Sequence, residues 1–378
     1  MTDVLIFGDT IRFPELRHEL AVAVPDAFLY VEADGQRHVV IASMEIPRLE
    51  GTPGLECHPL EEFGWDELTG SGMSREEILH AVALRAVSEL GVTDAAVPFG
   101  FPIGLADMLR AEGVELHADQ KLFDDRRRVK TEAELAGIRR AQRAAEAGMT
   151  AARDLLRRAA AANGVATLEG EPLTSERLKA AISQAFTEHG CTADDFIVSH
   201  GPQAAIGHEM GSGEILVGEP VVIDLWPRDS ESACYADMTR TFCVGEPSDE
   251  LREWHRLAKE SLDRSRAALR AGASGRAVYD ESCEAFEAAG HTTQRTKTPG
   301  QTLTDGYFHS LGHGVGLEVH EQPGLGLTSQ ETLLAGDVVT LEPGVYRRGV
   351  GGVRLEDLLL VTEDGAENLT NYPYDLEP

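Results

Sequence analysis

The sequence predicts a protein of the α/β (α+β) class with two domains, a smaller α/β domain over residues 1–125 and a larger one over residues 126–378. Three observations support this prediction. The chain has 378 residues, of which 42% are hydrophobic, enough for two domains of about 100–200 residues each. Short apolar strand patterns alternate with helix patterns in the first third. The remainder contains a weak internal repeat.

The charge balance excludes several classes of partner. The chain has 34 Lys and Arg against 64 Asp and Glu, a formal net charge of −30. This argues against nucleic-acid binding, which needs a basic face, and against docking on anionic lipid. No apolar run approaches the roughly 18 residues of a membrane span, and the N-terminus lacks the pattern of a signal peptide. Five widely spaced cysteines without a C-x-x-C pair favour free thiols in a reducing compartment. We therefore expect a cytoplasmic protein.

The first domain is predicted from its strand and helix signals. Strands are expected at 4–7, 27–31 and 38–42, the last two joined as a hairpin by the turn Asp34-Gly35. Ser74 and Glu77 form a capping-box pattern that begins a helix ending near Leu90. A further strand at 95–98 and a helix at 101–112 complete the domain. No catalytic cluster is evident in it.

The domain boundary is placed in the charged segment 124–130, which shows no helical or strand periodicity. Thr131 and Glu134 then form a second capping-box pattern. An Ala-rich helix with apolar residues near helical spacing is expected from there to about Ala161.

The internal repeat relates two halves of the second domain. Residues 218–224 resemble 336–342 at an offset of 118, and 235–238 match 354–357 at an offset of 119. First helices begin near Thr131 and Ser248, and second helices end near positions 190 and 290. Each half is therefore predicted as helix, helix and strands. An apolar strand ends in a carboxylate in each half, and a later strand carries another: Asp224, Asp237, Glu342 and Glu356.

Four carboxylates brought together by related halves indicate a metal site. Buried carboxylates repel, and their desolvation costs several kcal/mol unless cations neutralise them. Between the hairpins, residues 309–321 contain His309, His313 and His320 with glycines at 312, 314 and 316. These glycines permit close backbone approach and oppose a helix. One imidazole with four carboxylates suits two divalent ions that share bridging carboxylates. The spacing alone does not select which histidine is the ligand.

At this point the sequence resembles a known family. Residues 309–321 look like the signature of Xaa-Pro aminopeptidases and Xaa-Pro dipeptidases (prolidases), metallopeptidases of the pita-bread fold. Further similar segments, in the same order, are 128–134, 221–224, 237–241, 336–344 and 352–357. The resemblance covers roughly residues 126–370. A divergent creatinase-type N-terminal domain would account for residues 1–125.

The resemblance implies a set of five metal ligands. Asp224 would hold one ion, His313 and Glu342 the other, and Asp237 and Glu356 would bridge the pair. Manganese is the first expectation for both ions, with cobalt, zinc and iron as alternatives. A bridging hydroxide would attack the scissile carbonyl, and Glu342 would accept its proton.

Four further residues match substrate-side positions of the family. His208 would help proton transfer or contact the leaving group, and His320 would donate to the carbonyl oxygen as it gains charge. His309 would line the substrate pocket. Arg354 would orient a carboxylate or a water near the metals. A supporting structural role is the alternative for each.

The implied function is hydrolysis of the bond between an N-terminal residue and proline, on a peptide with proline in the second position, by a homodimer. An X–Pro bond has no N–H, so ordinary strand-like peptide binding fails. The alternatives are an Xaa-Pro dipeptidase, a non-peptide C–N amide hydrolase on the same fold, and an inactive binding scaffold. The twelve residues between Asp224 and Asp237 form a longer connection than is common in the family. This loop contains Trp226, as a core residue or as a pocket wall.

Overall fold

The computed structural model describes residues 2–378, which form two compact units divided at Arg127 and Arg128. The charged segment 124–130 is not the non-periodic connection that we predicted. Helix α6 (Gln120–Arg128) extends through most of it. Leu122 and Phe123 pack into the core of the first unit. Of the charged residues that follow, Asp125 is exposed, whereas Arg127 and Arg128 are buried.

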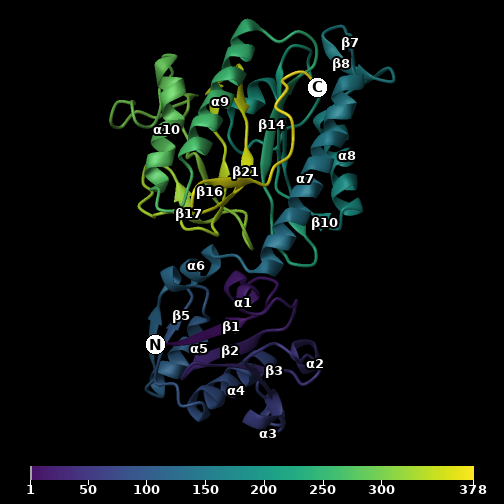
Figure 1. Cartoon of the computed structure of the whole chain (residues 1–378). Coiled ribbons are helices and arrows are strands. Elements are labelled where there is room, and N and C mark those ends of the chain that lie inside the picture. Colours follow the sequence, from purple (N-terminus) through teal and green to yellow (C-terminus); the bar gives the residue numbers. More distant parts are fainter. Residues whose placement is uncertain (1) are drawn as a thin grey trace. The chain divides into compact units, whose positions relative to one another are not determined.

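The first unit is built on one six-stranded sheet (Figure 1). Its strands are β1 (Asp3–Gly8), β2 (Phe28–Ala33), β3 (Gln36–Ile41), β4 (Leu55–Pro59), β5 (Asp94–Val97) and β6 (Glu115–Ala118), in the spatial order β4-β3-β2-β1-β5-β6. The predicted hairpin is confirmed as the antiparallel pair β2–β3. The edge strand β4 pairs with β3 in parallel.

Helices contribute to an apolar core on each face of this sheet. They are α1 (Pro14–Glu19), α2 (Ile46–Leu49), the 3-10 helix η1 (Leu60–Phe63), α3 (Trp65–Thr69), α4 (Arg75–Glu89), α5 (Ile103–Ala111) and α6. The capping box of Ser74 and Glu77 is present at the start of α4, as predicted. One core joins α3, α4 and α5 to the sheet, and the other joins α1 and α6 to it.

Four long helices frame the second unit, two from each half of the repeat. They are α7 (Glu132–Arg158), α8 (Ser175–Glu188), α9 (Asp249–Ala268) and α10 (Gly275–Ala288). The predicted capping box of Thr131 and Glu134 begins α7, and the Ser248 hydroxyl caps α9. Figure 1 shows the pair α7 and α8 on one side of the strands and the pair α9 and α10 on the other.

The strands of the second unit form five small sheets. The first half contributes β7 (Ala160–Ala162), β8 (Val165–Leu168), β9 (Glu171–Pro172), β10 (Cys191–Thr192), β11 (Ile197–His200), the 3-10 helix η2 (Gly201–Ala205), β12 (Pro220–Leu225), β13 (Arg228–Asp229) and β14 (Met238–Cys243). The second half contributes β15 (Asp305–Gly306), β16 (Gly312–Gly314), β17 (Glu321–Leu325), β18 (Val338–Leu341), β19 (Gly344–Arg347), β20 (Gly351–Arg354), β21 (Asp357–Val361) and β22 (Ala366–Asn368). The sheet orders β11-β12-β14 and β17-β16-β18-β21-β22 place corresponding strands of the two halves in comparable positions.

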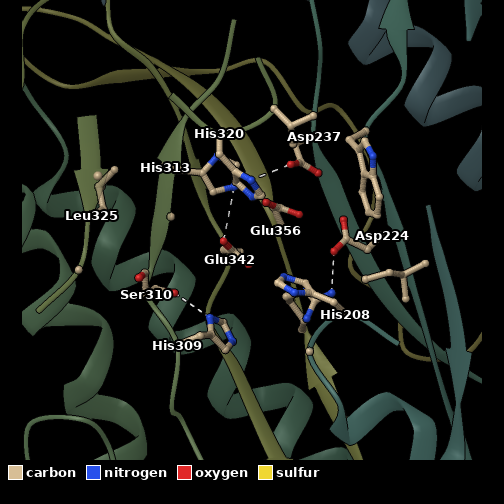
Figure 2. Close-up of a pocket in the computed structure, with 18 of the residues that line it drawn as sticks. His208, Asp224, Asp237, His309, Ser310, His313, His320, Leu325, Glu342 and Glu356 are labelled. Carbon is tan, nitrogen blue, oxygen red and sulfur yellow. Dashed lines mark hydrogen bonds and ion pairs between the residues drawn. The ribbon is translucent and has the colours of Figure 1, made fainter. Parts of the chain in front are cut away.

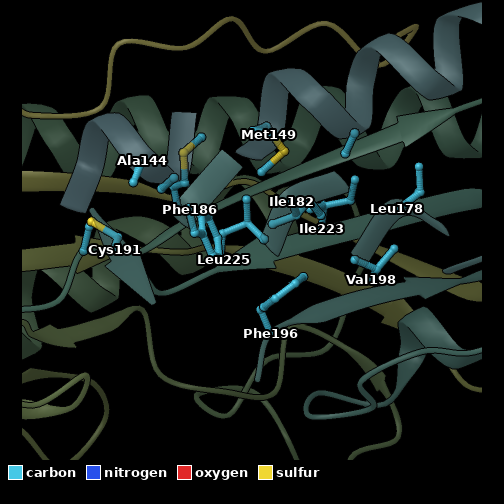
Figure 3. Close-up of a cluster of buried hydrophobic side chains, with 14 of the residues drawn as sticks. Ala144, Met149, Leu178, Ile182, Phe186, Cys191, Phe196, Val198, Ile223 and Leu225 are labelled. Carbon is cyan, nitrogen blue, oxygen red and sulfur yellow. The ribbon is translucent and has the colours of Figure 1, made fainter. Parts of the chain in front are cut away.

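Each half has its own apolar core. In the first, Met149 of α7 and Ile182 and Phe186 of α8 pack against Ile223 and Leu225 of β12 (Figure 3). In the second, residues of α9 and α10 pack against β18 and β21. In each half, packing against the helices therefore fixes the strands whose ends carry the predicted ligands.

Two features bear on the composition-based expectations. Among residues 2–378, no helix is both long and apolar enough to cross a membrane. All five cysteines are free, and four of them are buried.

Candidate metal centre

All nine residues predicted for the site line one cavity of about 960 Å³ in the second unit (Figure 2). They are His208, Asp224, Asp237, His309, His313, His320, Glu342, Arg354 and Glu356. We refer to Asp224, Asp237, His313, Glu342 and Glu356 as the central cluster.

Strand ends position the central cluster. Asp224 lies in β12 and His313 in β16. Asp237 directly precedes β14, Glu342 directly follows β18, and Glu356 lies between β20 and β21. The two halves thus supply the carboxylates that the repeat predicted.

Contacts across the repeat hold Glu356 beside the first half. The Thr239 hydroxyl of β14 donates to Glu356 Oε2 at 2.7 Å, and Glu356 N–H donates to the Thr239 carbonyl at 3.0 Å. Arg240, 1% exposed, donates to the Glu356 carbonyl at 2.7 Å and to Asp357 Oδ1 at 2.9 Å. Two consecutive residues of β14 thus have different roles. Thr239 contacts the Glu356 carboxylate, whereas Arg240 contacts the Glu356 backbone and the Asp357 carboxylate.

Glycines are required on both sides of His313. A Cβ on Gly312 would collide with the Thr340 carbonyl, and one on Gly314 with the Gln322 carbonyl. The close approach of β16 to its neighbours brings the imidazole to the carboxylates, which confirms the prediction of close backbone approach in this segment.

The hydrogen bonds of His313 fix its tautomer. Nδ1 lies 3.1 Å from the Gly314 carbonyl, and a carbonyl can only accept, so Nδ1 carries the proton. The lone pair of Nε2 then faces the carboxylates, 3.8 Å from Asp237 Oδ2 and 3.7 Å from Glu342 Oε1. Burial lowers the pKa of His313 to about 4, which keeps it neutral. A neutral imidazole with its distal N–H on a carbonyl is the usual form of a metal ligand.

The carboxylates are buried against one another. Asp224, Asp237 and Glu356 are 8%, 4% and 1% exposed. Burial, reinforced by the neighbouring carboxylates, raises the pKa of Asp237 and of Glu356 well above the usual range. Burial likewise raises the pKa of Glu342 to about 8. Without a cation, such a site must bind protons instead.

The donor set fits divalent metal ions. Asp237, His313 and Glu356 each offer a donor atom, and these atoms lie within 4.8 Å of one another. Within residues 2–378, buried Asp224 Oδ1 and Asp237 Oδ1 have no hydrogen-bond partner. Since buried carboxylate oxygens are nearly always bonded, these two indicate where cations would bind. The other oxygen of Asp224 accepts from Arg354 Nη2 at 2.6 Å.

A chain of hydrogen bonds joins Arg354 to His309 through Tyr346. Arg354 Nη1 donates to Tyr346 Oη at 3.1 Å. The Tyr346 hydroxyl lies 2.9 Å from His309 Nε2, and His309 Nδ1 lies 2.7 Å from the Ser310 carbonyl. His309 therefore donates through Nδ1 and accepts from Tyr346 through Nε2. Burial lowers the pKa of His309 to about 3, so this histidine stays neutral.

His320 and His208 also line the cavity. The ring of His320 packs edge-on to His313 with centroids 4.2 Å apart, and burial lowers its pKa. His208 is exposed in the segment after η2 and lines the same cavity.

Sequence reasoning missed Thr239 and Tyr346, although a signal for them exists. Side chains alternate along strands, so Thr239 shares a face with Asp237, as does Tyr346 with Glu342. In the pair β19–β20, Tyr346 lies opposite Gly352, where a Cβ would collide with its ring. Trp226, which we predicted as core or pocket wall, is both, since it packs against the first core and lines the cavity.

Comparison with known proteins agrees with this architecture. Residues 136–363 match metallopeptidase family M24. The chain belongs to this family. The predicted family resemblance and the pita-bread fold class with a preceding N-terminal domain are thereby confirmed.

Similar proteins carry the names of proline-specific M24 peptidases. A 183-residue stretch is 36% identical to an Xaa-Pro dipeptidase of Pyrococcus furiosus, over 47% of this chain and 47% of that protein. The match thus spans about half the length of that relative. An Xaa-Pro dipeptidase structure from Bacillus anthracis is 25% identical with a TM-score of 0.78, covering 99% of this chain and 94% of that one. An X-Pro aminopeptidase structure from Thermotoga maritima, 22% identical, has the same fold with a TM-score of 0.78 over 99% and 97%.

Proposed function

We propose that this chain is a metal-dependent peptidase that hydrolyses the bond between an N-terminal residue and proline. The main support is the central cluster, which lines a cavity large enough for a short peptide. Its neutral histidine, oriented carboxylates and unpartnered carboxylate oxygens form a cation site rather than a structural core.

Two divalent ions, with manganese as the first candidate, would be held by the five side chains of the central cluster. When bound, such ions lower the pKa of a water molecule and polarise the substrate carbonyl. Asp224 would contribute Oδ1, because Arg354 occupies its Oδ2.

The remaining side chains are assigned roles from their positions. Glu342 is only partly covered and lines the cavity, so its carboxylate, kept ionised when cations are bound, would accept a proton from the attacking water. His320 lies beside His313 and would donate to the carbonyl oxygen as charge develops. Arg354 and Tyr346 orient Asp224 and His309. The exposed His208 would contact the leaving side of the substrate.

Substrate length separates two versions of this function. The sequence predicted an aminopeptidase, whereas the similar proteins of Pyrococcus furiosus and Bacillus anthracis are named dipeptidases. We propose dipeptides with C-terminal proline as the first substrates to test. Cleavage of longer peptides is the alternative. The homodimer, the cytoplasmic location and the creatinase-like assignment of residues 1–125 stay predictions.

The test is a substrate panel on metal-stripped and Mn²⁺-reloaded protein. An X-Pro dipeptide, the tripeptide X-Pro-Y, the dipeptide X-Ala and a non-peptide amide are compared by product release. We expect the X-Pro substrates to be cleaved only after reloading, and X-Ala to be cleaved at least tenfold more slowly. Cleavage of the dipeptide but not the tripeptide selects a dipeptidase. Cleavage of only the non-peptide amide, or of nothing, overturns the proposal.

A further inference from the structure

A second group of metal-binding side chains lies in the first unit, on the parallel strands β3 and β4. His38 pairs in register with Glu56, and His58 is two residues further along β4. Side chains two apart share a face, so these three, here called the N-terminal cluster, meet on one side of the sheet. His38 Nδ1 lies 3.2 Å from His58 Nε2 and 3.5 Å from Glu56 Oε2. Glu56 Oε1 lies 3.9 Å from His58 Nε2.

These separations match those between ligands on one small ion. Zinc binds imidazole nitrogen at about 2.0–2.1 Å in a tetrahedral arrangement, which places two ligand atoms about 3.3 Å apart. The two nitrogens are already at this spacing. The Glu56 side chain is 66% exposed, so it can turn to complete the set.

A supporting carboxylate orients one of the imidazoles. His58 Nδ1 lies 2.9 Å from Glu62 Oε2 on η1. An ionised carboxylate only accepts, so Nδ1 carries the proton and the Nε2 lone pair points at His38. The ring of Phe63 packs edge-on to His58 with centroids 5.8 Å apart. A carboxylate behind a histidine is the usual support of a zinc ligand.

The burial and the donor types of the cluster suit a zinc-type ion. The imidazoles of His38 and His58 are only 11% and 15% exposed. Two imidazoles and one carboxylate are a zinc-type donor set with a fourth position for water, whereas calcium and magnesium prefer oxygen ligands alone.

A group on β5 and β6, at the opposite edge of the same sheet, provides a natural comparison. Asp94, Glu115 and His117 also place donor atoms within 4.8 Å of one another. Their side chains are 50%, 71% and 49% exposed, and only one imidazole is present. This group lacks the spacing of two buried imidazoles.

We propose that His38 Nδ1, His58 Nε2 and the Glu56 carboxylate bind one zinc-type divalent ion that links the edge strand β4 to β3. In the metal-free cluster, His38 Nδ1–H donates to His58 Nε2. On binding, both nitrogens face the ion, and His38 carries its remaining proton on Nε2. The ion is separate from those of the central cluster and would not act on the peptide substrate.

The test measures Zn²⁺ bound per full-length chain by equilibrium dialysis with elemental analysis. Wild type is compared with His58→Ala, Glu56→Gln and the matched control His117→Ala. We expect the first two variants to bind one ion fewer than wild type and the control to bind the same number. Glu62→Gln should retain the site with affinity lowered about 10–100-fold.

Two controls distinguish loss of the metal site from a folding defect. Circular dichroism of the metal-free variants checks the fold, and Glu56→Gln changes an exposed side chain. Equal zinc content in wild type, His58→Ala and Glu56→Gln would overturn the proposal. Loss of the ion in His117→Ala instead would also overturn it, because the site would then lie in the other group.

Discussion

The central cluster and the N-terminal cluster both bring imidazole and carboxylate groups within a few ångströms, but they differ in burial. Asp237 and Glu356 of the central cluster are 4% and 1% exposed. The Glu56 side chain of the N-terminal cluster is 66% exposed. The central carboxylates come from strand ends far apart in the chain, whereas the N-terminal cluster lies on two adjacent paired strands.

This difference determines what each cluster can do without a metal. The buried Asp237 and Glu356 and the partly covered Glu342 all have raised pKa values, so they must share protons or bind cations. In the N-terminal cluster, a hydrogen-bond chain from His38 through His58 to Glu62 satisfies the polar atoms. The central cluster therefore needs cations or protons to offset its carboxylates, whereas the polar atoms of the N-terminal cluster are satisfied without a metal.

The largest expected effect is the loss of kcat when Glu342 is replaced. Replacing it with alanine removes both a ligand and the proposed proton acceptor, and we expect kcat on an X-Pro substrate to fall about 10³-fold. Steady-state kinetics at saturating Mn²⁺ measure this, with the exposed Glu363→Gln as control. If Glu342→Ala kept wild-type kcat, the central cluster would have no catalytic role.

The next effect is on the pH dependence of stability in metal-free protein. Folded Glu342 holds its proton up to about pH 8, whereas the unfolded chain releases it near its ordinary value of 4.5. The unfolded state binds fewer protons in this range, so the free energy of unfolding falls as pH rises. The lowered pKa values of His309 and His313 oppose this only below about pH 6.5. From pH 6.5 to 8 we expect a loss of roughly 1 kcal/mol per pH unit.

Urea denaturation at several pH values measures this slope. Metal-loaded protein should lack it, because ions replace the protons, and Glu342→Gln should reduce it in the metal-free state. A stability that rises from pH 6.5 to 8 without metal would contradict the raised pKa of the buried carboxyl.

The smallest effect concerns Tyr346. Tyr346→Phe removes the hydroxyl between Arg354 and His309 while keeping the ring. Supporting groups around a metal site contribute about tenfold or more, so we expect kcat/KM to fall about tenfold with metal content unchanged. Tyr374→Phe, which removes the bond to Asp357, is the matched control. A loss of bound metal in Tyr346→Phe would show that this residue supports the ligands instead of the substrate side.

The sequence anticipated much of the second unit. The capping box at Thr131, like the one at Ser74 in the first unit, was predicted because capping depends on residues three apart. The offsets of 118 and 119 identified the four carboxylates because related halves place equivalent strand ends together. The helix through Arg128 was missed because Leu122 and Phe123 precede the charged segment, so their burial is not visible within it.

The N-terminal cluster was also missed, since the first domain was expected to contain no catalytic group. His38 and Glu56 are brought together by the parallel register of β3 and β4. No periodicity in the sequence specifies the pairing of strands separated by a helix. Thr239 and Tyr346 were visible only as alternate strand positions. The partner of Thr239, Glu356, lies in the other half, and Tyr346 contacts Arg354 of the adjacent strand β20.

The sequence by itself determined which charged side chains this protein offers to a metal, because residue type and repeat spacing are properties of the chain. The tertiary structure decided how those side chains are arranged. The close approach of β16 through Gly312 and Gly314 brings His313 to the carboxylates. The Gly314 carbonyl selects the nitrogen that faces them, and Arg354 takes one oxygen of Asp224 and leaves the other. These outcomes rest on packing and hydrogen-bond direction between distant segments, which a linear pattern does not contain.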